Sequence, residues 1–493
     1  MKKILVANRG EIALRIMRTC REMNIKTIAV YSEADRNALF VRFADEAYCI
    51  GSPASSQSYL VIDKIIDVAK KSGADGVHPG YGFLSENAAF ARRLEQEGIE
   101  LIGPSAHSME VMGDKLAAKE TALKQGVPLV PGSDGAVTDL EEAKAVAREV
   151  GFPLLIKASA GGGGKGMRAV YNEESIDEEL KLAMSEAKSA FGDPSVFIER
   201  YVTSPRHIEV QVLADKHGNC VYLFDRECSI QRRHQKVIEE APASILTPEM
   251  RKEMGECAVS LAKGCNYKGA GTVEFLVDDK MNFFFLEMNT RLQVEHPVTE
   301  MITDIDLVKQ QILVARGEKL AFTQEDLQIR GHALEVRVYA EDPRNNFLPD
   351  IGTLQTYRRP QGPGVRVDDG FEEGMTIPIY YDPMIAKLVT FAEDRKSAID
   401  RMTRAIDEYE ISGVATTLEF CRFAINHDAF VSGNFDTHFV EQHFKPEYLD
   451  VPELDNEEAL AAFIGSVALT EAGSVPSQGI QQPLTSKWKI NRR

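Results

Sequence analysis

Short apolar runs alternate with segments of helical periodicity over the first hundred residues. Ile4–Ala7 and Thr27–Tyr31 are apolar runs of strand length, whereas Glu11–Met23 and Tyr59–Lys71 repeat their apolar residues at helical spacing. Strands that alternate with helices of this length form a parallel sheet covered by helices on both faces. The pattern therefore predicts a doubly wound, Rossmann-like α/β domain over residues 1–113.

The regular alternation ends at Lys115. The Gly- and Pro-containing stretch Gly126–Gly135 predicts a hinge. We expect a mobile lid over about residues 131–204, inside a central α+β domain that spans residues 114–330. Near the end of that domain, two apolar runs separated by Asp278–Met281 predict a β-hairpin.

Short strands predominate from His332 onward and predict a third, β-rich domain over residues 331–446, with one helix at Arg395–Tyr409. The expected strands are Ala333–Ala340, Val365–Asp368, Ile377–Tyr381 and Ala386–Phe391. Residues 447–493 form a tail in which Asn456–Ala472 has the pattern of one amphipathic helix. This helix either docks on a partner subunit or belongs to a partly ordered terminus.

Charge and cysteine content narrow the class of protein. The formal net charge of −18 argues against binding to nucleic acid or to an anionic membrane, since both require a basic face. The 7 cysteines are scattered and form no C-x-x-C pair, which predicts reduced thiols rather than a zinc site. No apolar run has the length of a signal sequence or a membrane span. We expect a soluble, cytoplasmic protein.

A glycine run, Gly161–Gly166, is the first candidate for chemistry. It satisfies G-x-G-x-x-G, but Met167–Val170 after it has the pattern of a strand rather than a helix, which argues against a dinucleotide site. The run also lacks the G-K-[ST] end of a P-loop. A flap between two strands can bring backbone amides close to phosphates, and Lys157 and Lys165 favour that reading over a merely flexible loop.

Polar residues alternate from Glu287 to Glu295. If this segment is extended, Glu287, Asn289, Arg291, Gln293 and Glu295 share one face. A solvated edge strand would alternate in the same way. The combination of two acids, an amide and an arginine directly after three phenylalanines favours a site instead.

The predicted hairpin places Glu274 opposite Glu287. Two carboxylates held close together repel each other and favour a divalent cation, and Mg²⁺ combines such a pair with nucleotide phosphates. A surface pair of acids is the alternative. A basic cluster in Glu227–Lys236 marks either an anion site or a solvated charged face.

Taken together, these segments resemble the biotin carboxylase family of ATP-grasp enzymes. The resemblance covers about residues 1–446 in order. It rests on strings such as ILVANRGEIA at Ile4, HPGYGFLSEN at His78, IKASAGGGGKGM at Ile156, ECSIQRRHQKVIEEAP at Glu227, EMNTRLQVEHPVTE at Glu287, EVRVYAEDP at Glu335 and YYDPMIAKL at Tyr380. It implies a Rossmann-like N-terminal domain, an ATP-grasp domain with a mobile lid, and a β-rich C-terminal domain.

The resemblance also implies roles for individual residues. For ATP it implies Lys115, Lys157, Gly162, Gly163, Gly164, Lys165, Gly166, Glu199, Val202, His207, Gln231, His234, Glu274 and Glu287. For Mg²⁺ or Mn²⁺ it implies Glu274, Glu287 and Asn289, and for bicarbonate Lys236, Arg291, Gln293 and the Val294 backbone. Glu295 would take the bicarbonate proton and Arg337 would face the biotin ureido group, so that the catalytic residues are Glu295, Arg291, Arg337 and Lys236.

The biotin itself is expected on another chain. In this family the biotin-accepting lysine lies between two methionines, and the sequence contains no Met-Lys-Met. We therefore expect a separate biotin carrier and a carboxyltransferase subunit, and the resemblance implies a homodimer. The chain looks closest to the biotin carboxylase module of propionyl-CoA and related acyl-CoA carboxylase α subunits. Separate biotin carboxylase subunits of pyruvate carboxylase have a similar layout, and the final acceptor stays open.

Two other functions fit parts of the sequence. One is an ATP-grasp ligase that makes an acyl phosphate for attack by an amine, against which the strings at Glu287 and Tyr380 weigh. The other is a catalytically silent ATP-binding or scaffolding subunit. Such a subunit is expected to have lost Glu295, Arg291, Lys236 or Arg337, and all four are present.

Overall fold

The computed structural model describes residues 1–133, 135–158, 167–233, 235–450 and 464. By its internal contacts the chain divides into two units, Met1–Pro446 and Glu447–Arg493. The helix predicted over Asn456–Ala472 therefore lies outside the described residues, except for Ile464.

The N-terminal part is a five-stranded sheet in the order β3-β2-β1-β4-β5, and every pair is parallel. This confirms the predicted doubly wound α/β arrangement. Its strands are β1 (Lys3–Val6), β2 (Lys26–Ser32), β3 (Glu46–Gly51), β4 (Gly76–His78) and β5 (Glu100–Leu101). The helices are α1 (Gly10–Glu22), α2 (Leu39–Phe43), α3 (Ile62–Ser72), α4 (Ala88–Gln96) and α5 (Ala106–Gly113).

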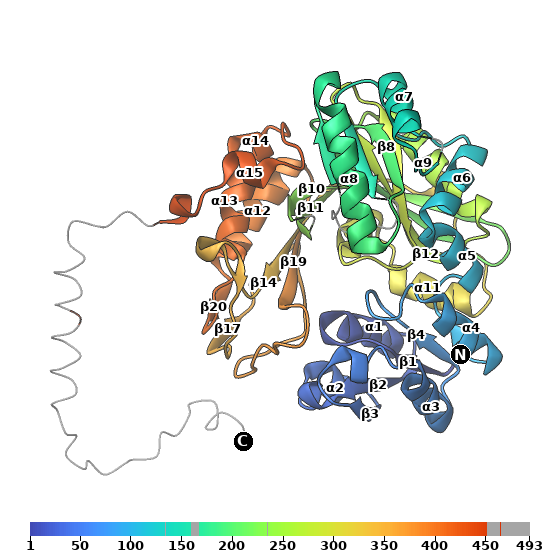
Figure 1. Cartoon of the computed structure of the whole chain (residues 1–493). Helices are drawn as coiled ribbons and strands as arrows, with labels where there is room; N and C mark the ends of the chain where they lie inside the picture. Colours follow the sequence, from blue (N-terminus) through green and yellow to red (C-terminus); the bar gives the residue numbers. More distant parts are fainter. Residues whose placement is uncertain (134, 159–166, 234, 451–463, 465–493) are drawn as a thin grey trace, which may run out of the picture. The chain divides into compact units, whose positions relative to one another are not determined.

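The segment predicted as the lid, called the lid below, is a small unit with a core of its own. Three antiparallel strands in the order β7-β6-β8 carry the two helices α7 and α8 (Figure 1), and their apolar side chains form a separate buried cluster. The elements are α7 (Leu140–Val150), β6 (Leu154–Ala158), β7 (Met167–Val170), α8 (Ile176–Phe191) and β8 (Val196–Arg200). Within the stretch predicted as a hinge, Gly132 passes so close to the Ile198 carbonyl that a Cβ atom would lie 2.5 Å from that oxygen.

The largest element is one eight-stranded antiparallel sheet, in the order β13-β12-β9-β10-β11-β14-β19-β18. It includes strands from both the central and the C-terminal parts of the chain, because β11 pairs with β14. The strands are β9 (Arg206–Ala214), β10 (Cys220–Arg232), β11 (Gln235–Ala241), β12 (Gly269–Val277), β13 (Phe283–Asn289), β14 (His332–Tyr339), β18 (Val365–Asp369) and β19 (Met384–Ala392).

Helices cover this sheet and the short strands beside it. In the central part these are α6 (Lys115–Lys124), α9 (Pro248–Gly264), α10 (His296–Thr303) and α11 (Leu307–Ala315). The C-terminal part has α12 (Arg395–Asp407), α13 (Leu418–Asn426), α14 (Asp428–Val431) and α15 (Phe439–His443). Two small sheets pair β15 (Glu341–Asp342) with β16 (Leu348–Pro349), and β17 (Thr356–Arg358) with β20 (Glu410–Ser412).

Two expectations for the C-terminal part are wrong. Ile377–Tyr381 is not a strand but a turn region in which Tyr380 is exposed. The helix α12 is also not alone, because α13–α15 follow it and bury their aromatic side chains, such as Phe420, Phe430 and Phe439, in the C-terminal core. Short helices rich in aromatic residues carry little helical periodicity, and tertiary packing rather than local pattern forms them.

The described residues include no helix that is long and apolar enough to cross a membrane. All seven cysteines are free thiols, and four of them are buried: Cys20, Cys228, Cys265 and Cys421.

Candidate active site

The hairpin of β12 and β13 sets two carboxylates opposite each other. Glu274 and Glu287 are direct cross-strand partners, which confirms the predicted pairing. Burial alone raises the pKa of Glu274, but Lys236 and His207 more than offset this and hold it well below its usual value. Burial and the neighbouring Glu274 carboxylate both raise the pKa of Glu287. A divalent cation between these carboxylates would relieve their repulsion.

The alternating face predicted from Glu287 to Glu295 is wrong beyond Asn289, where β13 ends. The backbone N–H of Thr290 donates to Glu86 Oε1 at 2.9 Å and is thereby taken out of the strand ladder. The chain then turns, and Glu295 occupies the N-cap position of α10. The predicted polar residues still converge, but a turn brings them together rather than the alternation of a strand.

A buried lysine, Lys236 on β11, joins three carboxylates. Its Nζ atom donates to Glu209 at 2.6 Å, to Glu295 at 2.8 Å and to Glu274 at 2.9 Å. Burial lowers the pKa of Lys236, but these three acids dominate and hold it well above its usual value. Lys236 is therefore a permanent cation, surrounded by more negative charge than it can neutralise.

Glu295 lies between two cations. Lys236 contacts one of its oxygens, and Arg337 Nη2 on β14 donates to Oε2 at 3.0 Å. Arg337 is itself held from behind by Glu239 Oε1, which accepts from Nε at 2.6 Å. Although burial raises the pKa of Glu295, Lys236 and Arg337 hold it well below its usual value, so this carboxylate is ionised at neutral pH.

Gln293 and Asn289 both donate to Glu274 Oε1 at 2.9 Å. Gln293 also accepts from the fully buried Arg226 at 2.6 Å, which fixes its amide orientation. The Oδ1 atom of Asn289 accepts from Arg291 Nη2 at 2.9 Å. As it stands, the Asn289 oxygen therefore faces an arginine and not the pair of carboxylates.

Glu86 is a site residue that no sequence pattern singled out. It accepts from Arg291 Nε at 2.8 Å and from Thr290, so that an acid of the N-terminal part orients the loop after β13. The HPGYGFLSEN string contains Glu86 and was the signal that could have found it. Glu209 and Arg226, which hold Lys236 and Gln293, were missed in the same way, because both looked like ordinary alternating strand residues.

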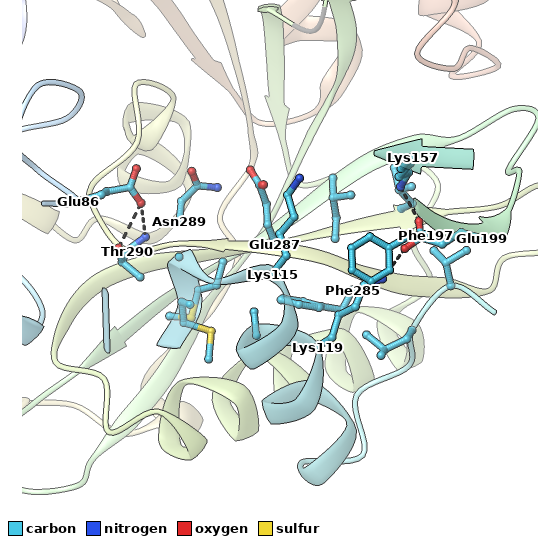
Figure 2. A pocket seen from close by; sticks show the side chains of 18 of the residues that line it. Glu86, Lys115, Lys119, Lys157, Phe197, Glu199, Phe285, Glu287, Asn289 and Thr290 are labelled. Atoms are coloured by element: carbon cyan, nitrogen blue, oxygen red, sulfur yellow. Dashed lines mark hydrogen bonds and ion pairs between the residues drawn. The ribbon is translucent and has the colours of Figure 1, made fainter. Parts of the chain in front are cut away.

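A cavity of about 550 Å³ lies beside this cluster. Figure 2 shows Glu86, Thr290 and Asn289 at one end, Lys157, Phe197 and Glu199 at the other, and Lys115 and Glu287 between them. Glu199 accepts from both Lys119 and Lys157 at 2.5 Å. With three lysines and several apolar side chains, including Phe285, Leu276 and Met288, the cavity can hold a flat apolar ring and a polyanion together.

Several predicted nucleotide residues lie elsewhere. Val202, His207, Gln231 and Glu274 do not line this cavity. His207 Nε2 instead pairs with Glu274 Oε2 at 3.0 Å, and Gln231 donates to the Cys228 carbonyl at 2.9 Å. The predicted residues Gly162, Gly163, Gly164, Lys165, Gly166 and His234 lie outside the described residues.

A second cavity, of about 400 Å³, begins where the first ends, because Thr290 lines the first and Arg291 the second. Arg337 and the Val294 segment also line it. Four tyrosines contribute aromatic walls: Tyr81, Tyr339, Tyr380 and Tyr381. A polyanion in the first cavity and a flat polar ring in the second would thus meet at the loop that follows β13.

Three family descriptions match the chain in succession. Residues 1–109 match "Biotin carboxylase, N-terminal domain", residues 114–323 match "Carbamoyl-phosphate synthase L chain, ATP binding domain", and residues 335–442 match "Biotin carboxylase C-terminal domain".

Whole-length comparisons agree with these matches. A pyruvate carboxylase subunit of Methanothermobacter thermautotrophicus is 57% identical over 441 residues, which cover 90% of both chains. The mitochondrial propionyl-CoA carboxylase alpha chain of Mus musculus is 50% identical over 501 residues, covering 99% of this chain and 69% of that one. The biotin carboxylase domain dimer of Hydrogenobacter thermophilus 2-oxoglutarate carboxylase was solved with MgADP, ADP and bicarbonate. It is 49% identical, covers 92% of this chain and 99% of that one, and superposes with a TM-score of 0.85.

Proposed function

The chain belongs to the biotin carboxylase family, and we propose that the cluster around Lys236 and Glu295 is where it activates bicarbonate. It is an ATP-dependent biotin carboxylase that works as part of a pyruvate or acyl-CoA carboxylase. The family, the three-part fold and the enzyme class predicted from the sequence are confirmed. The assignment of single residues to steps is our proposal.

ATP would occupy the larger cavity. Lys115 and Lys157 supply charge for the phosphates, and Glu199 offers a carboxylate to the adenine amino group once Lys119 and Lys157 release it. The glycine flap at Gly162–Gly166 would cover the triphosphate, with His234 near the nucleotide. Lysines beside the phosphates offset the charge that builds on the transferred phosphoryl group.

Glu287, which lines this cavity, and its cross-strand partner Glu274 fit a divalent cation. Glu274 and Glu287 are opposed in register, Asn289 adjoins them, and hard oxygen ligands of this kind suit Mg²⁺ or Mn²⁺. When bound, the cation would neutralise phosphate charge beside the γ-phosphoryl group. Rotation of the Asn289 amide would turn its oxygen from Arg291 to the cation.

Changing Glu287 to glutamine removes one anionic ligand and the repulsion with Glu274. We expect the Mg²⁺ concentration for half-maximal ATP cleavage to rise by at least about 10- to 100-fold, the scale found when residues that only support metal ligands are changed. Titration of ADP release with Mg²⁺ at saturating ATP measures it. Glu256→Gln, on the exposed face of α9, is the matched control and should leave the titration unchanged. Equal curves for the two variants would remove Glu287 from the metal site.

Bicarbonate would lie among Lys236, Arg291, Gln293 and the Val294 backbone, with Glu295 accepting its proton. The cations that keep Glu295 ionised also stabilise the carbonate dianion, so the weak basicity of Glu295 does not prevent the transfer. The deprotonated oxygen attacks the γ-phosphorus, ADP leaves, and carboxyphosphate forms. The convergence of Lys236 on Glu274 and Glu295 is the single observation that carries this assignment.

Biotin would enter the second cavity. Carboxyphosphate breaks into CO₂ and phosphate, the phosphate takes the proton from biotin N1′, and the resulting enolate attacks CO₂. Arg337 lines this cavity and is the group that would stabilise the negative ureido oxygen as it forms. Because Arg337 also donates to Glu295, one hydrogen bond would connect the group proposed to face biotin with the group proposed to deprotonate bicarbonate.

We propose that the biotin belongs to a separate carrier protein and that a carboxyltransferase subunit completes the reaction in the cytoplasm. The M. thermautotrophicus relative is named as one subunit of its carboxylase, which supports this division of labour. A homodimer is proposed because the H. thermophilus domain was solved as a dimer. The acceptor is pyruvate or an acyl-CoA. To identify the acceptor, the chain can be purified with its native partners and the complex assayed for carboxylation of pyruvate and of acyl-CoA substrates.

The proposed site is tested by substrate dependence. With MgATP, the purified chain should release ADP only when bicarbonate is present, and free biotin should increase the rate and become carboxylated. A rate of ADP release that does not depend on bicarbonate would contradict the assignment of Lys236 and Glu295. A rate that does not change when free biotin is added would contradict the assignment of the second cavity.

A further inference from the structure

A second buried lysine, Lys387 on β19, lies next to the site. Its side chain is 0% exposed, and it is the direct cross-strand partner of Arg337. An ammonium group removed from water is costly unless it is paired and hydrogen-bonded. The contacts of Lys387 therefore indicate what a buried lysine does at this position.

Those contacts reach two other parts of the chain. The Nζ atom donates to the backbone carbonyl of Val294 at 2.8 Å and lies 3.4 Å from Glu11 Oε2 at the start of α1. The other Glu11 oxygen accepts from the hydroxyl of Tyr81. Glu11, Tyr81 and Val294 all line the second cavity. Lys387 thus joins the N-terminal, central and C-terminal parts at the wall of this cavity.

Two neighbouring cations hold consecutive residues of one loop. Lys387 binds the carbonyl of Val294, and its cross-strand partner Arg337 binds the carboxylate of Glu295. Because Glu295 directly follows Val294, the bond from Lys387 determines the peptide orientation from which the Glu295 side chain projects toward Lys236. We propose that Lys387 is a positioning residue that fixes the Val294–Glu295 segment for bicarbonate activation.

The charges around Lys387 fit this role. Asp368, its partner on β18, is engaged by Arg366 at 2.6 Å, and burial raises the pKa of Glu335 well above its usual value although Lys387 opposes this. Burial also lowers the pKa of His296, and Lys387 lowers it further. Against the effect of burial, Lys387 also helps to lower the pKa of Asp368, but Glu11 is the carboxylate that forms an ion pair with Lys387. Burial raises the pKa of Glu11 while Lys387 opposes the rise.

This inference rests on the proposed bicarbonate site and deepens it. Lys387→Met keeps the length of the side chain and removes its charge and its hydrogen bonds. We expect kcat for bicarbonate-dependent ADP release to fall by up to about 10²-fold, the cost of a misplacement near 1 Å. The KM for bicarbonate should rise, while the KM for MgATP stays within about twofold. A purely structural lysine would not separate the two substrates in this way.

Glu11→Gln is the second variant, because it keeps the hydrogen bond to Val294 possible but removes the balancing charge. We expect the same signature, a raised KM for bicarbonate with unchanged KM for MgATP, at a smaller size. Lys252→Met on the exposed face of α9 is the control.

The inference is overturned if Lys387→Met has the kcat and KM values of the wild type. It is also overturned if the KM for bicarbonate and the KM for MgATP rise by the same factor in this variant. If Lys387→Met does not fold, an unchanged bicarbonate KM in Glu11→Gln overturns it. Absence of bicarbonate dependence in wild type would instead refute the proposed site.

Discussion

Glu295→Gln is expected to reduce bicarbonate-dependent ADP release by about 10²- to 10⁴-fold, the contribution of a positioned general base. Glutamine keeps the size and one acceptor oxygen but cannot take the bicarbonate proton. It also leaves Lys236 and Arg337 each with one anionic partner fewer. The KM for MgATP should change little, because Glu295 does not line the cavity that we assign to ATP. Initial rates of ADP release over a range of bicarbonate concentrations give the measurement.

Glu300→Gln is the matched control for this change. Glu300 lies on α10, whose N-cap is Glu295, is likewise buried, and is likewise bound by two cations, at 2.7 Å from Arg15 and 2.8 Å from Arg366. Its carboxylate lines neither cavity. If Glu300→Gln loses as much activity as Glu295→Gln, the loss reflects disturbance of α10 and the role of base is not supported.

Arg337→Ala is expected to abolish carboxylation of free biotin while most ATP binding remains. The loss should reach at least about 10²- to 10³-fold, as found when one donor to a developing oxyanion is removed. ADP release should fall less than biotin carboxylation, because Arg337 only adjoins Glu295 on the bicarbonate side. Parallel assays of carboxybiotin formation and nucleotide affinity measure the two effects.

The control for Arg337 is Arg395→Ala. Arg395 is a largely buried arginine of the C-terminal part that pairs with Glu240 at 2.6 Å and lines neither cavity. Its loss tests whether removing any buried arginine from this region is enough to impair the enzyme. Equal loss of ATP binding and biotin carboxylation in Arg337→Ala would contradict the assignment to biotin.

Local pattern predicted most of the regular elements and one essential pairing. The helix predicted over Arg395–Tyr409 is observed as α12, and the predicted hairpin correctly placed Glu274 opposite Glu287. Both depend on short-range rules, helical periodicity and strand–turn–strand spacing. The geometry that follows Asn289 was not predictable in this way, because the bond from Thr290 to Glu86 spans 204 residues.

The burial of charged side chains was the second feature that could not be predicted from the sequence. Lys387 is the one charged residue of β19 among mostly apolar neighbours, and because lysines are ordinarily exposed, its face of the strand would be expected to reach solvent. The structure buries that face because β14, β18 and β19 extend the central sheet and α10 packs across it. Arg226 and Glu335 are buried for the same long-range reason. A single sequence shows that such residues are charged, but not that the fold will remove them from water.

The separate core of the lid has a consequence for local stability. The apolar cluster formed by α7, α8 and β6–β8 is distinct from the clusters that hold the eight-stranded sheet. A unit with its own core can open or unfold as a foldon while the rest of the chain stays native. Lys236, Glu295, Arg337 and Lys387 all lie outside that foldon, on the sheet or on the loop beside it. Amides of the lid are thus expected to exchange with solvent well before those of β11 and β14, because opening of this unit leaves the sheet that carries Lys236 and Arg337 folded.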